Sequence, residues 1–173
     1  MTDLAPMPEL TDQDTALLIL VATGASHHTI IRAATLALRP HEVGDAIESL
    51  LAKTRTRTVL HLAAWATAHR IVTDTAEPCA ALAITPQLTP RLLQVLRGWA
   101  AGRSTPELTA DFGISPMTMR TYTKTLLSEL GVRSQIQASV VGVLTGLTLL
   151  SDIDPAWPAH PLIRAAQPSG LAA

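Results

Sequence analysis

The stretch LTPRLLQVLRGWAAGRSTPELTADFGISPMTMRTYTKTLLSELGVRSQIQA, residues 88–138, decides the fold that we expect for this chain. Thr89 can cap a first helix that ends at Gly102, because glycine tolerates the left-handed conformation found at helix C-termini. Ser104 and Glu107 have the spacing of a capping box, which satisfies free backbone N–H groups at the start of a helix. These capping residues and the terminal glycine predict two consecutive helices joined by a short turn.

A third and a fourth helix follow in the same stretch. Gly113 allows a sharp turn, Ser115 can cap the next helix with Pro116 at its first position, and Gly131 can end it. Ser134 can cap a fourth helix. The third helix has an apolar inner face at helical spacing, made of Met119, Leu126, Leu127 and Leu130. Two capped helices around a glycine turn are the helix-turn-helix layout, in which the second helix enters the DNA major groove.

These residues resemble the DNA-binding domain of the LuxR/GerE (FixJ, NarL) family. The resemblance runs from Leu88 to about Leu147 and is carried by the opening LTP, A-x-G-x-S before the second helix, the GIS turn, and L-G-V-R-S after the third helix. Two departures stand out. Leu92-Leu93 replace the usual early glutamate, and Leu108-Thr109 replace an Ile-Ala pair. The resemblance implies a four-helix, double-stranded-DNA-binding domain.

The resemblance also implies that Pro116 to Leu130 is the recognition helix. Arg120, Thr121 and Lys124 share one face of it, opposite the apolar row. Arginine can bond guanine O6 and N7, and lysine supplies a point charge for phosphate, although basic residues on a helix are often only solvated. The predicted DNA-binding residues are Ser115, Thr118, Arg120, Thr121 and Lys124, with Arg103 and Arg133 as phosphate contacts near helix ends.

The first part of the chain also resembles the second part in sequence. Leu10, Thr11, Gly24 and Ser26 align with Leu88, Thr89, Gly102 and Ser104, and after a short insertion Arg57, Thr58 and His61 align with Arg133, Ser134 and Gln137. We therefore predict an all-α protein of two tandem four-helix LuxR-type domains. Their expected bounds are 1–72 and 88–150, with a linker at 73–87 and a mobile, proline-rich tail at 151–173.

The first copy is predicted to have lost the DNA-reading face. At the positions aligned with Arg120 and Lys124 it has Gly44 and Glu48, and its helix PHEVGDAIESLLAK, residues 40–53, carries three carboxylates. Carboxylates there would repel phosphates. Residues 1–78 hold nine acidic and six basic side chains, whereas residues 88–150 hold three acidic and six basic ones. We expect this degenerate copy to serve pairing or partner docking.

The two fourth helices suggest how pairing occurs. Thr58 to Val72 carries one full charge, Arg70, and Ser134 to Leu150 carries none. A helix that is apolar on more than one face is buried on more than one side, and in this family the fourth helix forms the dimer interface. We expect a homodimer or a pseudo-dimer within one chain, unless these helices only complete their own cores. The predicted interface residues are Val141, Leu144, Leu62 and Trp65.

The sequence gives little support to other classes of function. The chain has six histidines and a single cysteine, Cys79, without the spacing of a metal site, so we predict no metal and no cofactor. Glycine-rich phosphate loops, nucleophile elbows and paired catalytic carboxylates are missing, so an enzyme is not expected. The N-terminal residues MTDLAPMPEL lack signal-peptide features, and polar residues interrupt the most apolar segment. We expect a cytoplasmic protein without a membrane span.

The sequence thus predicts a transcriptional regulator that binds double-stranded DNA through its second domain. The alternative is a protein-interaction co-regulator or anti-activator, whose acidic first domain acts on another DNA-binding protein. A sigma-factor module would share the helix-turn-helix but would need a promoter-melting region that 173 residues cannot hold.

Overall fold

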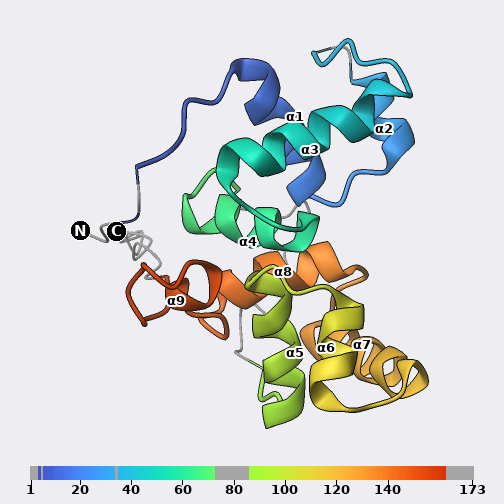
Figure 1. Ribbon diagram of the computed structural model, residues 1–173, viewed down its shortest axis with the longest axis vertical. Helices are drawn as coiled ribbons and strands as arrows, with labels where there is room; N and C mark the ends of the chain where they lie inside the picture. Colours follow the sequence, from blue (N-terminus) through green and yellow to red (C-terminus); the bar gives the residue numbers. More distant parts are fainter. Residues whose placement is uncertain (1–3, 5, 34, 73–85, 163–173) are drawn as a thin grey trace, which may run out of the picture.

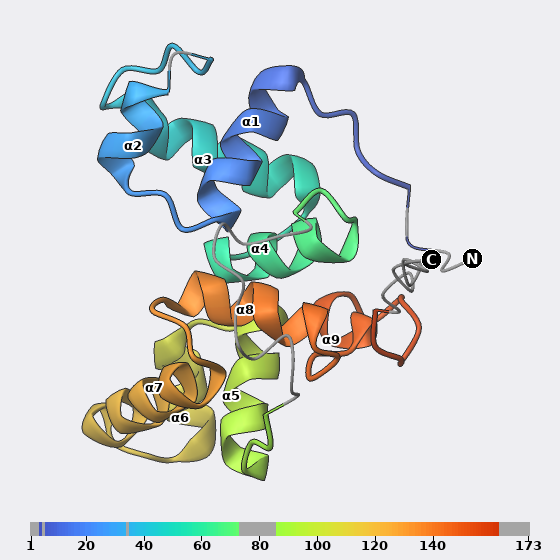
Figure 2. The same ribbon diagram turned by 180° about the vertical axis from the view of Figure 1, so that it is seen from behind.

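The computed structural model describes residue 4 and residues 6–33, 35–72 and 86–162. In these residues the chain is helical, with a single isolated bridge between Leu149 and Pro161 and no strand, so the predicted all-α fold is confirmed there. Figures 1 and 2 show the arrangement from two sides. The helices are α1 (Asp12–Ala22), α2 (His27–Arg32), α3 (Glu42–Thr54), α4 (Val59–Ala68), α5 (Pro90–Ala100), α6 (Thr105–Phe112), α7 (Pro116–Leu130), α8 (Gln135–Leu144) and α9 (Leu150–Ile153).

The helix starts predicted in the second half are confirmed, whereas the fourth helix, expected over Ser134 to Leu150, ends at Leu144. The side chains that precede α5 to α8 each accept a hydrogen bond from a backbone N–H in the first turn: Thr89, Ser104, Ser115 and Ser134. The Ser104–Glu107 capping box is formed. Gly113 and Gly131 end α6 and α7 in the left-handed conformation, with φ of 61° and 65°. Local capping chemistry therefore explains where these helices begin and end.

The first half has a similar order of helices, but its third helix has weaker capping residues at both ends. Thr11, Ser26 and Thr58 cap α1, α2 and α4 through their side chains. The N-cap of α3, His41, makes no such hydrogen bond, and α3 ends at Arg55 with a left-handed φ of 56° instead of at a glycine. A non-glycine residue in this conformation costs about 1 kcal/mol. Packing must therefore stabilise α3 more than its own ends do.

Helices α4 and α8 lie side by side between the two halves (Figures 1 and 2). In the described part of the chain they pack against each other more extensively than any other pair of helices. Every residue from 61 to 68 and from 138 to 144 is buried. Val140 and Val143 of α8 belong to the hydrophobic cluster of the first half, whereas Val141 belongs to the cluster of the second half. Helix α8 therefore contributes to the hydrophobic clusters of both halves.

The prediction of a mobile tail from residue 151 is wrong for residues 151–162. Residues 151–153 complete α9, and Trp157 buries all but 5% of its surface in the cluster of the first half. The backbone N–H of Leu150 also donates to the carbonyl of His160. Burying an indole ring outweighs the proline content that suggested mobility. Most of the predicted linker, residues 73–85 with Cys79, and residues 163–173 lie outside the described residues.

Candidate nucleic-acid interface

Helix α7 has one face in the core and one in solvent. Met119, Leu126 and Leu130 are at most 1% exposed and pack into the cluster of the second half, against α5, α6 and α8. Arg120 and Lys124 lie on the accessible side together with Thr121. Since the inward residues fix the rotation of the helix, the exposed set is presented in one orientation.

The hydroxyl groups at the start of α7 are already hydrogen-bonded. Ser115 Oγ accepts from the backbone N–H of Thr118 at 3.1 Å and shares a 2.9 Å hydrogen bond with Thr118 Oγ1. Thr121 Oγ1 donates to the carbonyl of Met117 at 3.2 Å. A hydroxyl keeps a lone pair or can rotate, so these groups remain able to bond a ligand. Their first role is to hold the N-terminus of the helix.

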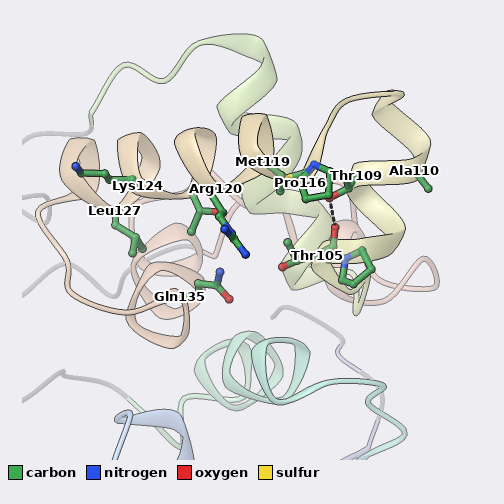
Figure 3. A pocket seen from close by; sticks show the side chains of 11 residues that line it. Thr105, Thr109, Ala110, Pro116, Met119, Arg120, Lys124, Leu127 and Gln135 are labelled. Atoms are coloured by element: carbon green, nitrogen blue, oxygen red, sulfur yellow. Dashed lines mark hydrogen bonds between the residues drawn. The ribbon is translucent and has the colours of Figure 1, made fainter.

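The two cations of α7 border a groove of about 640 Å³ between α6, α7 and the start of α8. Figure 3 shows Arg120 extending toward Gln135, while Lys124 points away from it. Within the described ranges neither side chain forms an ion pair. An unpaired, solvated cation keeps its full charge for an external anion, so this side of α7 is suited to phosphate or a base edge.

The two predicted phosphate contacts differ in the structure. Arg103 forms an ion pair with Asp111 of α6, so its guanidinium is engaged in the free protein. Arg133 is exposed and, in the part of the chain that is described, forms no ion pair. Its backbone N–H donates to Gln137 Oε1 at 2.9 Å, which fixes the turn before α8. Arg133 is therefore the more available of the two.

Thr105 and Gln135, which sequence reasoning missed, line the same groove. Each is the first residue of its helix, directly after the capping serine. Helix N-termini carry a partial positive charge and favour anions. The signal was present in the sequence as the residue following each capping serine, but only the packing of α6 and α8 places both beside Arg120 (Figure 3).

Helix α3 of the first half exposes side chains of the opposite charge. Asp45 and Glu48 are exposed on α3, and Gly44 borders open space, because a Cβ at this position would meet no neighbouring side chain within 4 Å. Glu42 accepts a 2.8 Å hydrogen bond from the backbone N–H of Arg39 and so is used to start the helix. The exposed surface of α3 therefore presents carboxylates, whereas that of α7 presents cations.

One ion pair joins the two halves near this interface. Arg57, just before α4, lies 3.1 Å from Glu107 of α6. The hydrogen bond from the backbone N–H of Ser104, with further contributions from the Ser104 hydroxyl and Arg57, lowers the pKa of Glu107 to about 2. Glu107 thus remains ionised at neutral pH and caps α6 while it contacts the other half.

The four predicted interface residues are all buried. Leu62 and Trp65 of α4 and Leu144 of α8 lie in the cluster of the first half, and Val141 of α8 lies in that of the second. They contribute to packing within one chain, and their role between chains stays a prediction. Among the described residues there is no group of three or more His, Cys, Asp or Glu suited to a metal. In the same residues no helix is long and apolar enough to cross a membrane.

Comparison with known families agrees with the geometry of the second half. Residues 86–141 match the family described as Bacterial regulatory proteins, luxR family. Neither a search of curated proteins nor a search of solved structures returned a significant match. Residues 86–141 therefore form a LuxR-type helix-turn-helix domain. A domain of this type indicates a DNA-binding regulator of transcription.

Proposed function

We propose that this protein is a transcriptional regulator that reads the DNA major groove with α7. The observation that carries the proposal is the exposed face of this helix. Arg120 and Lys124 are unpaired within the described residues, and buried Met119 and Leu126 fix the opposite face. In the proposed complex Arg120 reads a guanine, and Lys124 neutralises a phosphate.

The residues around α7 then position the helix on the duplex. Arg133 and the N-termini of α6 and α8, with Thr105 and Gln135, approach phosphates on the flank of the groove. Arg103 contributes only after its pair with Asp111 opens. Ser115 and Thr118 stabilise the helix N-terminus and present it to the backbone of the DNA.

We further propose that the first half is a degenerate copy that pairs with the second half inside one chain. The supporting observation is a reciprocal set of contacts. A Cβ on Gly102 would lie 2.6 Å from His61 Nδ1, near the start of α4, and one on Gly24 would lie 3.6 Å from Ser134 Oγ, at the start of α8. The start of α4 thus lies beside the glycine that follows α5, and the start of α8 lies beside the glycine that follows α1, as a two-fold arrangement of the halves would require.

In this arrangement one chain carries one DNA-reading face. The all-round burial of residues 61–68 and 138–144 leaves these segments of α4 and α8 no free surface for a second chain. The proposed target is therefore a single half-site without dyad symmetry, instead of an inverted repeat. Selection from a random-sequence duplex library should return an asymmetric motif; enrichment of inverted repeats would contradict this part of the proposal.

The proposed role of α7 is tested by measuring the affinity of the protein for the selected duplex. Fluorescence anisotropy over a range of salt concentrations gives this affinity. Arg120→Ala should cost about 1–3 kcal/mol and relax base preference, whereas Lys124→Ala should weaken all duplexes evenly and lower the salt slope by about one. Arg32→Ala, on exposed α2, is the matched control for loss of a charge. Unchanged affinity in the Arg120 and Lys124 double variant would refute the proposal.

The exposed carboxylates of α3 favour a second candidate function. Asp45 and Glu48 would suit a co-regulator that docks on the basic surface of another DNA-binding protein. The library selection separates the two candidates, because a co-regulator that does not bind DNA itself enriches no duplex.

A further inference from the structure

Helix α7 carries an exposed apolar side chain that the proposed DNA contacts do not include. Met117, the second residue of α7, keeps 67% of its surface accessible and is the most exposed large apolar residue in the described part of the chain. Met7 and Ile19 are exposed as well, at 56% and 40%. Single exposed apolar residues are normal on a protein surface. A role for Met117 therefore depends on where it lies on the helix.

Met117 lies in the middle of the exposed face of α7. An α-helix turns by about 100° per residue, so the side chain of Met117 leaves the axis about 180° away from that of buried Leu126. Thr121 and Lys124 follow about one and two turns later on the same face, and both are exposed. Met117 is thus in line with the proposed contacts, and it lies nearer the N-terminus of α7 than any of the residues from Arg120 onward.

The N-terminal end of α7 is the end that is expected to enter the major groove. In helix-turn-helix proteins the first residues of the recognition helix contact base edges. The N-terminus of a helix also carries a partial positive charge, which favours its approach to DNA. The only carboxylate of α7, Glu129, lies at the other end of the helix, in its last turn. In the proposed complex Met117 is therefore close to the bases and far from the group that would repel DNA.

The chemistry of this end of α7 suits a methyl group better than a hydrogen-bonding group. The thioether of Met117 has no donor and is only a weak acceptor. The hydroxyl of Thr121 donates to the carbonyl of Met117 at 3.2 Å, so that Thr121 offers its methyl group for contact with a ligand. The apolar feature of the major groove is the C5 methyl group of thymine. Thymine is thus the base that these two side chains would recognise.

We propose that Met117 is a specificity-determining residue that packs against the methyl group of a thymine next to the guanine read by Arg120. Thr121 borders the same methyl group from the next turn of the helix. This inference rests on the proposed reading of DNA by α7 and adds a second base to it. Burial of one methyl group in this contact should strengthen binding about fourfold.

The test uses the full chain and the duplex selected from the random-sequence library, with fluorescence anisotropy as the measurement. Deoxyuridine lacks the C5 methyl group of thymidine but still pairs with adenine, so it removes only the proposed contact. Each thymine beside the guanine to which Arg120→Ala becomes indifferent is replaced in turn. The parent protein should bind one of the uracil duplexes about fourfold more weakly than the thymine duplex. Met117→Ala should reduce this ratio to less than about twofold.

Two further variants test whether the ratio depends on an apolar side chain at this position. Met117→Leu, which keeps a side chain of similar size, should retain most of the difference between the thymine and uracil duplexes. Met7→Ala removes another exposed methionine, in the segment before α1, and should leave the ratio at about fourfold. Circular dichroism of each variant verifies that the helices are retained.

The possible failures of this inference and of the proposed function are distinguishable. The role of Met117 alone is overturned if the selected motif has no thymine beside that guanine, or if the parent protein binds the selected duplex and no uracil weakens it. A full ratio in Met117→Ala would overturn it as well. A protein that binds no duplex would instead refute the proposed function, and this inference with it.

Discussion

Helices α3 and α7, each the third helix of its half, differ in the charge of their exposed faces. Both keep a buried apolar row, with Val43 and Leu50 in α3 and Met119 and Leu126 in α7. Outward-facing residues contribute little to packing, so they can change from cations to carboxylates without loss of the helix. The comparison teaches that the fold depends on the apolar face of each helix, whereas the exposed face is free to carry either charge and, in α7, the proposed DNA contacts.

The comparison assumes that the two halves depend on each other for stability. A charge buried on α8, at a position that packs into the first half, tests this dependence. Val143 of α8 is fully buried in the cluster of the first half. Val143→Asp places an unpaired charge there, and we expect the free energy of unfolding to fall by about 3–5 kcal/mol. Chemical denaturation followed by circular dichroism measures the change. Ile19→Asp, at a position that is 40% exposed, is the control. A small effect of Val143→Asp would mean that the first half does not depend on α8.

Gly24 and Gly102, each of which lies beside the other half, sharpen the comparison between the halves. Gly24 and Gly102 both have a left-handed φ, of 76° and 79°, but a Cβ on Gly102 would lie 2.6 Å from His61 Nδ1. Gly24→Ala should cost about 1 kcal/mol for backbone strain alone. Gly102→Ala should cost about 2–4 kcal/mol, because His61 must also move. Thermal or chemical unfolding of both variants gives the difference, and equal losses would show that the halves are not held in the described contact.

The acidic face of α3 gives a smaller expected effect, on DNA affinity. If α3 and α7 are related by a two-fold axis, the carboxylates of α3 approach the duplex beside the half-site. Asp45→Asn with Glu48→Gln should then tighten DNA binding by roughly 1 kcal/mol or less, which is about fivefold, at low salt. The control is Glu9→Gln with Asp12→Asn, which removes the same charge elsewhere on the first half. An equal gain in DNA affinity in both double variants would mean that the effect comes from the net charge of the protein and not from the position of α3.

The pH dependence of stability tests the buried contact of His61. Burial lowers its pKa from 6.5, a shift that Asp154 opposes and Arg57 reinforces. Below pH 6.5 the unfolded chain takes up a proton that folded His61 resists, so the free energy of unfolding should fall as the pH is lowered. Burial lowers the pKa of His69 too, with the same sign. His61→Gln should flatten the pH dependence measured by denaturation, whereas the control His28→Gln should retain the slope of the parent protein.

Much of the second half could be predicted because its signals are local. Ser104, Ser115 and Ser134 cap helices through backbone groups three residues away, and Gly113 and Gly131 end helices through their own φ angles. Such interactions involve neighbours in sequence and need no knowledge of the rest of the fold. The same locality placed Arg120 and Lys124 on the exposed face of α7.

The sequence alone therefore determined the capped ends of α5, α6 and α7, the start of α8, and the chemistry of the exposed face of α7. Only the tertiary structure decided which partner each apolar face would have. It placed Val140 and Val143 in the core of the other half, brought Gln135 beside Arg120, and packed Trp157 against the first half despite its proline-rich surroundings. Apolar burial is nondirectional and proportional to area, so an apolar face specifies that it must be covered but not by what.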